Sequence, residues 1–268
     1  MHWKPDPTLY PPFLRARIRR GRGVGHGLEY VPWLKVRDVP SRGTSSVVSG
    51  IHVRRPYHLL SELEATYFFL IERRPSIIDI QEQWPILDID QTLTLCAQTG
   101  VRHGYRGPYP EPFTIDFLIT EEIEGKIRYH AASIKNPKDA ANPQVRQRLA
   151  IEHAWCGEWG VPWTLVDTSR FDRTLLANLR FLRAWFTNRY EPCLDDIERF
   201  AQRFELYYRT NILLDELIQQ VTHSLRLPES LARDTFLYCA WSDRITVSLQ
   251  HPLSLGQPLI LRRDAPHD

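Results

Sequence analysis

The apolar positions of this 268-residue chain recur first at helical and then at strand spacing. The first helical run begins at Ser61, because a serine followed three residues later by Glu64 is typical of a helix N-terminus, and Pro75 ends it. Leu63, Tyr67, Leu70 and Ile71 would fall on one face of this helix, at helical spacing. We therefore expect an amphipathic helix between Ser61 and Pro75.

Four apolar runs after this helix have the length and composition of β-strands. They cover residues 77–84, 113–119, 127–134 and 161–166. A second helix is expected over residues 143–157, with Pro143 in its first turn. The glycines and prolines of residues 88–112 predict a long loop or a loosely built hairpin. The order helix, strand, strand, strand, helix, strand predicts an α/β fold with a mixed sheet.

The pattern becomes helical from about residue 168 onward. The expected helices cover residues 175–189, 194–208, 212–224 and 228–241, and two short strands follow at residues 245–249 and 259–262. Three or four helices and a strand pair outline a winged-helix-like domain, a class that binds DNA or protein. The last helix is not notably basic, which favours a protein partner. We therefore expect two domains, residues 1–167 and residues 168–268.

The N-terminal segment is expected to be irregular. Residues 1–13 are rich in proline and aromatic residues, which predicts an extended arm. Residues 17–27 combine arginines with alternating glycines but lack the lysine and serine or threonine that end a nucleotide-binding P-loop. We expect them to form a flexible basic loop whose amides approach DNA phosphates. Residues 30–34 predict a short strand and turn that dock on the main body.

The formal net charge of +2 conceals a strongly basic stretch. Residues 14–55 hold ten basic residues against two acidic ones, a local net charge of +8. The basic residues are Arg15, Arg17, Arg19, Arg20, Arg22, Lys35, Arg37, Arg42, Arg54 and Arg55. Such a stretch is the electrostatic footprint of a nucleic-acid-binding protein. A solvated arm, or a face that pairs with an acidic protein, is the alternative.

Composition places the chain among soluble globular proteins, with 43% hydrophobic and 25% charged residues. The four cysteines lie far apart and have no metal-binding spacing. No apolar run approaches the roughly 18 residues that a membrane-spanning helix needs. We expect a cytoplasmic protein with reduced thiols and no membrane contact, associated with the nucleoid when it is bound to DNA.

Three ionisable residues are the candidates for chemistry. Asp116 lies inside an apolar strand, where a charge is costly unless it is paired or binds a metal. Glu64 alone could be only the capping partner of its helix, and Lys135 alone could be an exposed charge at a strand end. Brought together, two acids and a lysine have the groups that metal-assisted cleavage of a phosphodiester requires.

The element order, with acid, acid and lysine at these places, resembles the restriction-endonuclease-like PD-(D/E)xK core. Shorter stretches are more specific and resemble the TnsA family, the endonuclease subunits of heteromeric cut-and-paste transposons, including CRISPR-associated ones. These stretches are residues 21–27, 30–34, 39–41, 58–64 and 116–118. The resemblance covers residues 14–170 well and continues more weakly to the C-terminus.

The resemblance implies roles for the three candidates and for a magnesium cofactor. Glu64 matches a metal-binding glutamate on a helix, and Asp116 matches an aspartate shared by two Mg²⁺ ions. Lys135 matches the catalytic lysine.

Three further positions are implied with less direct roles. Where the family often has glutamine or glutamate, this chain has Ser133, whose shorter side chain would reach a metal directly or through water. The Ile134 carbonyl would complete the metal shell. Glu152 matches another acidic position of the family, and its alternative is an exposed helical charge.

The implied function is a Mg²⁺-dependent endonuclease that cuts the strand at the 5′ ends of a transposon. A TnsB-type transposase would process the 3′ ends, and a TnsC-type ATPase regulator would join the assembly. Double-stranded transposon-end DNA would contact Arg17, Arg19, Arg20, Arg22, Lys35 and Lys138. Two alternatives stay open: a stand-alone restriction or repair nuclease, and a catalytically weak DNA-binding scaffold in which Ser133 reports a decayed site.

Overall fold

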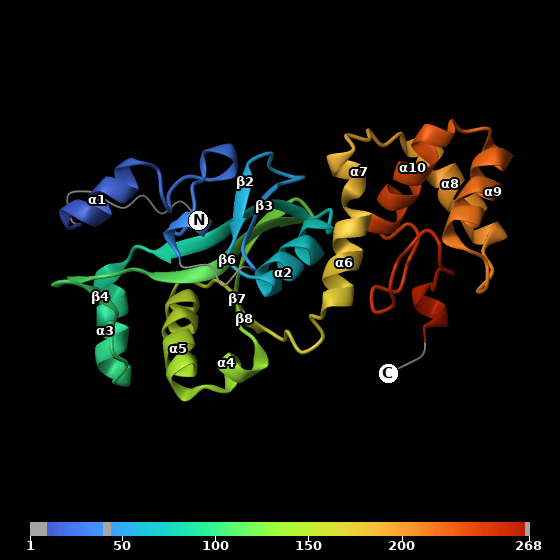
Figure 1. Ribbon diagram of the computed structural model, residues 1–268. Coiled ribbons are helices and arrows are strands. Elements are labelled where there is room, and N and C mark those ends of the chain that lie inside the picture. The colour runs from blue at the N-terminus through green and yellow to red at the C-terminus, as the bar shows by residue number, and fades with distance from the viewer. Residues whose placement is uncertain (1–9, 40–43, 266–268) are drawn as a thin grey trace. The chain divides into compact units, whose positions relative to one another are not determined.

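The computed structural model describes residues 10–39 and 44–265 (Figure 1). These residues form two compact units. Unit 1 lies within Met1–Phe68 and Pro75–Arg170, and unit 2 within Phe69–Arg74 and Phe171–Asp268. In the described part of the chain, no helix is long and apolar enough to cross a membrane.

A four-stranded mixed sheet is the centre of unit 1, in the order β3-β6-β7-β8. The strands are β3 (Ile77–Ile86), β6 (Phe113–Ile123), β7 (Lys126–Ile134) and β8 (Trp163–Val166). The pairs β3–β6 and β6–β7 are antiparallel, and β7–β8 is parallel. Glu124 and Gly125 join β6 to β7 and both have positive φ, as a two-residue hairpin turn requires. The predicted mixed α/β fold is confirmed at this level.

Helices and smaller elements cover the two faces of this sheet (Figure 1). The helices are α2 (Glu62–Glu72), α3 (Ile89–Thr99), α4 (Pro137–Ala141) and α5 (Pro143–Glu158). Helices α3 and α5 lie on one side of the sheet, and the N-terminal segment and the hairpin of β1 (Ser46–Ser49) and β2 (Pro56–Leu59) lie on the other (Figure 1). On the α5 side, the rings of Trp84 and Trp155 pack 5.5 Å apart within the core.

Residues 88–112 correct the expected loop, because they contain the helix α3 and a small hairpin of β4 (Tyr105–Arg106) and β5 (Tyr109–Pro110). Every glycine and proline of this stretch lies at or after Gly100, and Gly100 ends α3 in the left-handed conformation. Strand β3 also runs past Pro85. A proline is tolerated there because β3 is an edge strand of the sheet.

The N-terminal segment is more ordered than expected. Residues 1–9 of the expected arm lie outside the described residues, but Pro12 begins α1 (Pro12–Arg19), so the extended conformation expected for residues 12–13 and the loop expected for residues 17–19 are wrong. Proline fits the first turn of a helix, where no amide donor is needed. The 3₁₀ turns η2 (Gly27–Glu29) and η3 (Val36–Asp38) follow.

Strand β3 holds the glycine-rich loop through two polar side chains. Asp79 Oδ2 accepts from the Gly27 amide at 2.8 Å, and Gln81 Nε2 donates to the Gly25 carbonyl at 2.9 Å. The expected strand at residues 30–34 is only a single bridge between Arg22 and Val31. Side-chain anchoring to β3 therefore replaces a backbone ladder in this segment.

Unit 2 is helical, as predicted. Its helices are α6 (Arg173–Leu182), α7 (Ala184–Thr187), α8 (Leu194–Tyr207), α9 (Leu214–Leu225) and α10 (Glu229–Trp241), followed by η4 (Arg262–Asp264). Stacked rings of Phe200, Phe204 and Phe236 fill its core. The expected single helix at 175–189 is broken at Arg183, whose guanidinium instead pairs with the buried Glu72 at 2.7 Å.

The two expected C-terminal strands are also corrected. The segment around Val247 and the segment around Leu261 form one antiparallel bridge rather than two strands. Both side chains are buried, so the apolar alternation that predicted strands reflects packing onto the helices. Backbone bonds from Ser248 N to Ile260 O and from Arg262 N to Thr246 O flank the bridge.

Candidate active site

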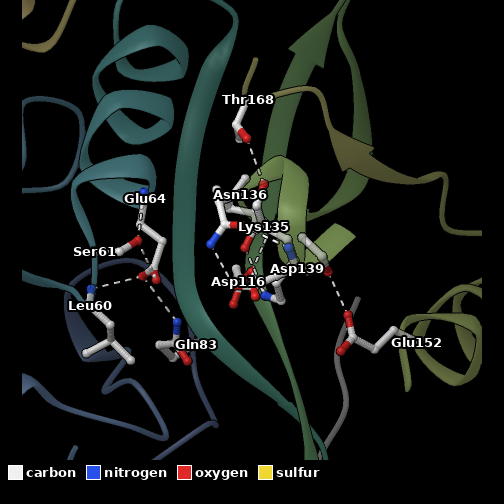
Figure 2. Close-up of polar contacts among 12 residues, drawn as sticks. Leu60, Ser61, Glu64, Gln83, Asp116, Lys135, Asn136, Asp139, Glu152 and Thr168 are labelled. Carbon is white, nitrogen blue, oxygen red and sulfur yellow. Dashed lines mark hydrogen bonds and ion pairs between the residues drawn. The ribbon is translucent and has the colours of Figure 1, made fainter. Parts of the chain in front are cut away.

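Helix α2 begins with a capping arrangement that also fixes Glu64. The Glu64 amide donates to Ser61 Oγ at 3.1 Å, and Ser61 Oγ donates to Glu64 Oε1 at 3.1 Å. Glu64 Oε2 accepts from the Leu60 amide at 3.0 Å and from Gln83 Nε2 at 3.3 Å. Glu64 is therefore both a cap partner and a buried carboxylate held in one orientation, as Figure 2 shows.

Asp116 and Lys135 meet where β6 begins and its antiparallel neighbour β7 ends. Asp116 Oδ2 accepts from the Ile134 amide at 2.6 Å and from Lys135 Nζ at 2.7 Å. Lys135 Nζ also donates to the Ile134 carbonyl at 2.9 Å, and Thr168 Oγ1 donates to the Lys135 carbonyl at 2.7 Å. These contacts place the ammonium group directly beside the Asp116 carboxylate (Figure 2).

Ser133 and Glu152 form a second buried pair behind Asp116. Ser133 is fully buried, and its Oγ donates to Glu152 Oε2 at 2.6 Å while it accepts from Trp163 Nε1 at 3.2 Å. Glu152 lies on α5 and is 3% exposed, so it is no solvated helical charge. The serine hydroxyl is thus engaged with a carboxylate on α5 and with an indole on β8.

The carboxylates influence one another electrostatically. Burial, and then the negative charge of Asp116, raises the pKa of Glu64 to about 7. The same two causes raise the pKa of Glu152 to about 7. Burial disfavours the Lys135 ammonium, but the charge of Asp116 and their hydrogen bond outweigh it and raise the pKa of Lys135. Glu64, Asp116, Lys135 and Glu152 therefore form one interacting cluster.

Gln83 is a candidate site residue that was not predicted from the sequence. It is buried inside β3 yet has a φ of 49°, a left-handed conformation that costs a non-glycine residue about 1–3 kcal/mol. Its neighbours Glu82 and Trp84 pair with Phe117 and Ile115, so Gln83 stands opposite Asp116. No local sequence signal marks Gln83, because a glutamine within a strand is ordinary until its backbone conformation is known.

The donor set fits a hard divalent cation. Glu64 and Asp116 supply buried carboxylate oxygens, and the Ile134 carbonyl lies beside them through its contact with Lys135. Oxygen ligands of this kind suit Mg²⁺, which keeps several water molecules in its shell. Within residues 10–39 and 44–265 no group of three or more His, Cys, Asp or Glu could hold a metal. A cation here would therefore take two carboxylates, a carbonyl and water.

The basic residues near the N-terminus are brought together only in part. The Arg17 guanidinium lies 5.1 Å from the Trp33 ring centroid, and Arg22 pairs with Asp38 at 2.6 Å. Burial, followed by the charges of Arg22 and Arg106, lowers the pKa of Arg17. Arg106, on the β4–β5 hairpin, was not among the residues expected from the sequence to contact DNA.

Lys35 joins the same group of charges. Burial, followed by the charges of Arg22 and Arg37, lowers the pKa of Lys35. Arg19 and Arg20 are exposed at the end of α1, and Lys138 is exposed on α4, three residues after Lys135. The N-terminal positive charges thus come from α1, the glycine-rich loop, η3 and the hairpin, whereas Lys138 belongs to the sequence that follows the candidate site.

Comparison with known proteins yields two matches. Residues 74–168 match the family described as "TnsA-like endonuclease N terminal". The chain is also 30% identical over 169 residues to "Transposon Tn7 transposition protein TnsA" of Escherichia coli, an alignment that covers 63% of this chain and 61% of that protein. The chain therefore spans less than two thirds of the length of this relative. The family match includes Asp116, Lys135 and Glu152 but begins after Glu64.

Proposed function

We propose that this chain is a TnsA-like endonuclease that cleaves DNA with the help of a divalent metal ion, a proposal supported by the family match over residues 74–168 and by the similarity to a TnsA protein. The observation that carries the proposal is the ion pair of Asp116 and Lys135, 2.7 Å long, in one electrostatic cluster with the buried Glu64. A site that had lost its nuclease activity would not be expected to retain two buried carboxylates that repel each other next to a lysine.

The side chains divide the chemistry among them. Glu64, Asp116 and the Ile134 carbonyl would hold one or two magnesium ions. Bound Mg²⁺ supplies charge neutralisation at the scissile phosphate and acidifies a coordinated water. The Lys135 ammonium has three N–H donors, two of which go to Asp116 and Ile134. The third can orient the attacking water and stabilise negative charge that develops on the phosphate.

Ser133 and Glu152 support this centre from behind. The Ser133 hydroxyl donates to Glu152 at 2.6 Å, which supports a role through that carboxylate in place of direct metal contact. Glu152 then holds the β7 end against α5, and its charge adds to the negative potential that attracts a cation. In this interpretation, Ser133 and Glu152 together take the place of the longer glutamine or glutamate side chain that the family often has at this position.

DNA would lie along the positive charges of unit 1. Arg17, Arg22, Lys35, Arg37 and Arg106 influence one another electrostatically although they come from four segments. Exposed Arg19, Arg20 and Lys138 extend this set. Lysine and arginine contacts to phosphates give affinity without sequence preference.

The name of the similar protein, which describes transposition, supports a finer proposal. We propose that the substrate is double-stranded transposon-end DNA and that the enzyme cuts the strand at the 5′ ends. A TnsB-type transposase and a TnsC-type ATPase regulator would be its partners, with the winged-helix-like C-terminal region facing protein. The restriction-endonuclease-like core would then act as one subunit of a larger assembly.

Strand-specific cleavage tests this function. DNA carrying a transposon end, labelled separately on each strand, is incubated in Mg²⁺ with the chain alone, with the co-encoded transposase alone, and with both. Cleavage at the 5′ end only in the mixture is the expected result. Cleavage by the chain alone would favour a stand-alone nuclease, and no added cleavage in the mixture would favour a non-catalytic scaffold.

A further inference from the structure

Strand β3 changes the direction of its side chains at Gln83. In a regular strand Glu82 and Trp84 would face the same side. Glu82 instead accepts from Arg55 Nη2 at 2.6 Å, beside β2, whereas Trp84 packs on Trp155 of α5. Elements β2 and α5 lie on opposite sides of the sheet (Figure 1). The left-handed residue between them is therefore where the alternation breaks.

Gln83 is held in this conformation from two sides. Its backbone carbonyl accepts from the Trp33 amide at 3.2 Å, and its side-chain Nε2 donates to Glu64 Oε2 at 3.3 Å. The register places it opposite Asp116 on the neighbouring strand. A buried, left-handed glutamine that is bonded to Glu64 and stands opposite Asp116 needs an explanation, because a glycine would adopt the same backbone without strain.

The hydrogen bonds on Glu64 suggest what Gln83 does. Oε2 accepts from both the Leu60 amide and Gln83, which uses its two acceptor directions, whereas among the described residues Oε1 has the Ser61 hydroxyl alone. Oε1 therefore keeps one direction open to a cation. A neutral amide is suited to this task, because it directs a carboxylate without neutralising its charge.

We propose that Gln83 is a positioning residue, which turns Glu64 so that Oε1 is presented to the divalent cation. The proposal rests on the proposed function, since it assumes that Glu64 and Asp116 bind metal. Groups that orient a metal ligand typically contribute about 10- to 100-fold to metal affinity or activity. The left-handed backbone at Gln83 is then the feature that brings the amide to Glu64.

The test compares variants of the full chain by calorimetric titration with Mn²⁺, together with thermal unfolding without metal. Gln83→Gly keeps the backbone conformation and removes the amide, and Gln83→Asn keeps an amide that is too short. Gln81→Ala is the matched control, because Gln81 is a buried amide on the same strand that donates to Gly25 and not to Glu64. Single-turnover cleavage is recorded in parallel.

We expect Gln83→Gly and Gln83→Asn to fold and to bind Mn²⁺ at least about 10-fold more weakly than the unsubstituted chain. Gln81→Ala should bind Mn²⁺ normally. Unchanged Mn²⁺ affinity in either folded Gln83 variant, or failure of both variants to fold, would assign Gln83 a purely structural role and overturn the proposal. No Mn²⁺ binding by the unsubstituted chain would instead overturn the proposed metal-dependent function itself.

Discussion

Glu152 illustrates how burial changes the pKa of an acidic side chain. On the sequence it could be an exposed helical charge, but it is 3% exposed and its pKa is raised to about 7 by burial and by Asp116. A glutamate in the unfolded chain titrates near 4.5. Between these two pH values the folded state holds a proton that the unfolded state has lost. The free energy of unfolding therefore falls as the pH rises from about 4.5 to 7.

The substitution Glu152→Gln should remove this pH dependence from the metal-free protein. Glutamine can still accept the Ser133 hydrogen bond but never becomes charged. From pH 5 to pH 8 in the presence of a chelator, the unsubstituted chain should lose on the order of 3 kcal/mol more stability than the variant. Urea unfolding measures this difference. Glu158→Gln, at an exposed position on the same helix, should behave as the unsubstituted chain, and the same behaviour in Glu152→Gln would contradict the prediction.

At the residue scale, the sequence allowed the acids and the lysine to be selected but not oriented. Asp116 was identifiable because a charge within an apolar strand demands a partner. Gln83 was not identifiable, since a glutamine in a strand is ordinary until its φ of 49° is known. The direction of the Ser133 hydroxyl toward Glu152 also depends on how β7 packs on α5. These are tertiary facts with no local sequence signal.

Among the elements, periodicity predicted α2, α5 and the strand sequence, and failed where glycine and proline dominated a window. Helix α3 was obscured by the glycines and prolines that follow it. The prediction of two C-terminal strands was wrong for a different reason. Val247 and Leu261 are buried in an alternating apolar pattern, but their segments share only a single bridge and no ladder of backbone hydrogen bonds. A local pattern reports which side chains are buried more reliably than which backbone bonds form.

The end of α3 depends on Gly100, which has a φ of 69°. Gly100→Ala should lower the free energy of unfolding by about 1 kcal/mol, because alanine is strained in the left-handed region although nothing blocks its Cβ. Chemical unfolding measures the change, and cleavage activity should stay unchanged. Gly104→Ala is the control, since Gly104 has equal space and no positive φ. Equal stability of the two variants would show that Gly100 does not act as a helix cap.

The whole molecule combines a sheet-centred unit that carries the acids with a helical unit. The hydrophobic period changes near residue 168, close to the chain boundary after Arg170, but nothing in the sequence marks Phe69–Arg74 as part of unit 2. The docking of the basic segment could not be predicted from the sequence, because it depends on hydrogen bonds that Asp79 and Gln81 form with a loop more than 50 residues away. Charge composition alone indicated a nucleic-acid interface but left its location in the fold open.

Neutralising two exposed arginines at the C-terminal end of α1 tests the proposed DNA surface. The double substitution Arg19→Gln and Arg20→Gln should weaken binding to every DNA sequence alike. The slope of log affinity against log salt should become shallower by about 0.9 for each DNA phosphate that the variant no longer neutralises. Fluorescence anisotropy over a salt series measures both effects. Arg199→Gln, an exposed change on α8 in unit 2, is the control, and an unchanged slope in the double variant would mean that α1 faces protein.

Removal of the Asp116 carboxylate is the sharpest test of a metal-dependent nuclease site, because Asp116 contacts Lys135 and influences both Glu64 and Glu152. Asp116→Ala is compared with Asp139→Ala, an exposed acid on α4. Both variants are assayed with the co-encoded transposase on transposon-end DNA in Mg²⁺. We expect Asp116→Ala to bind DNA and partner normally and to cut at least about 100-fold more slowly, whereas Asp139→Ala should cut normally. Cleavage by Asp116→Ala at the rate of the unsubstituted chain would contradict this expectation.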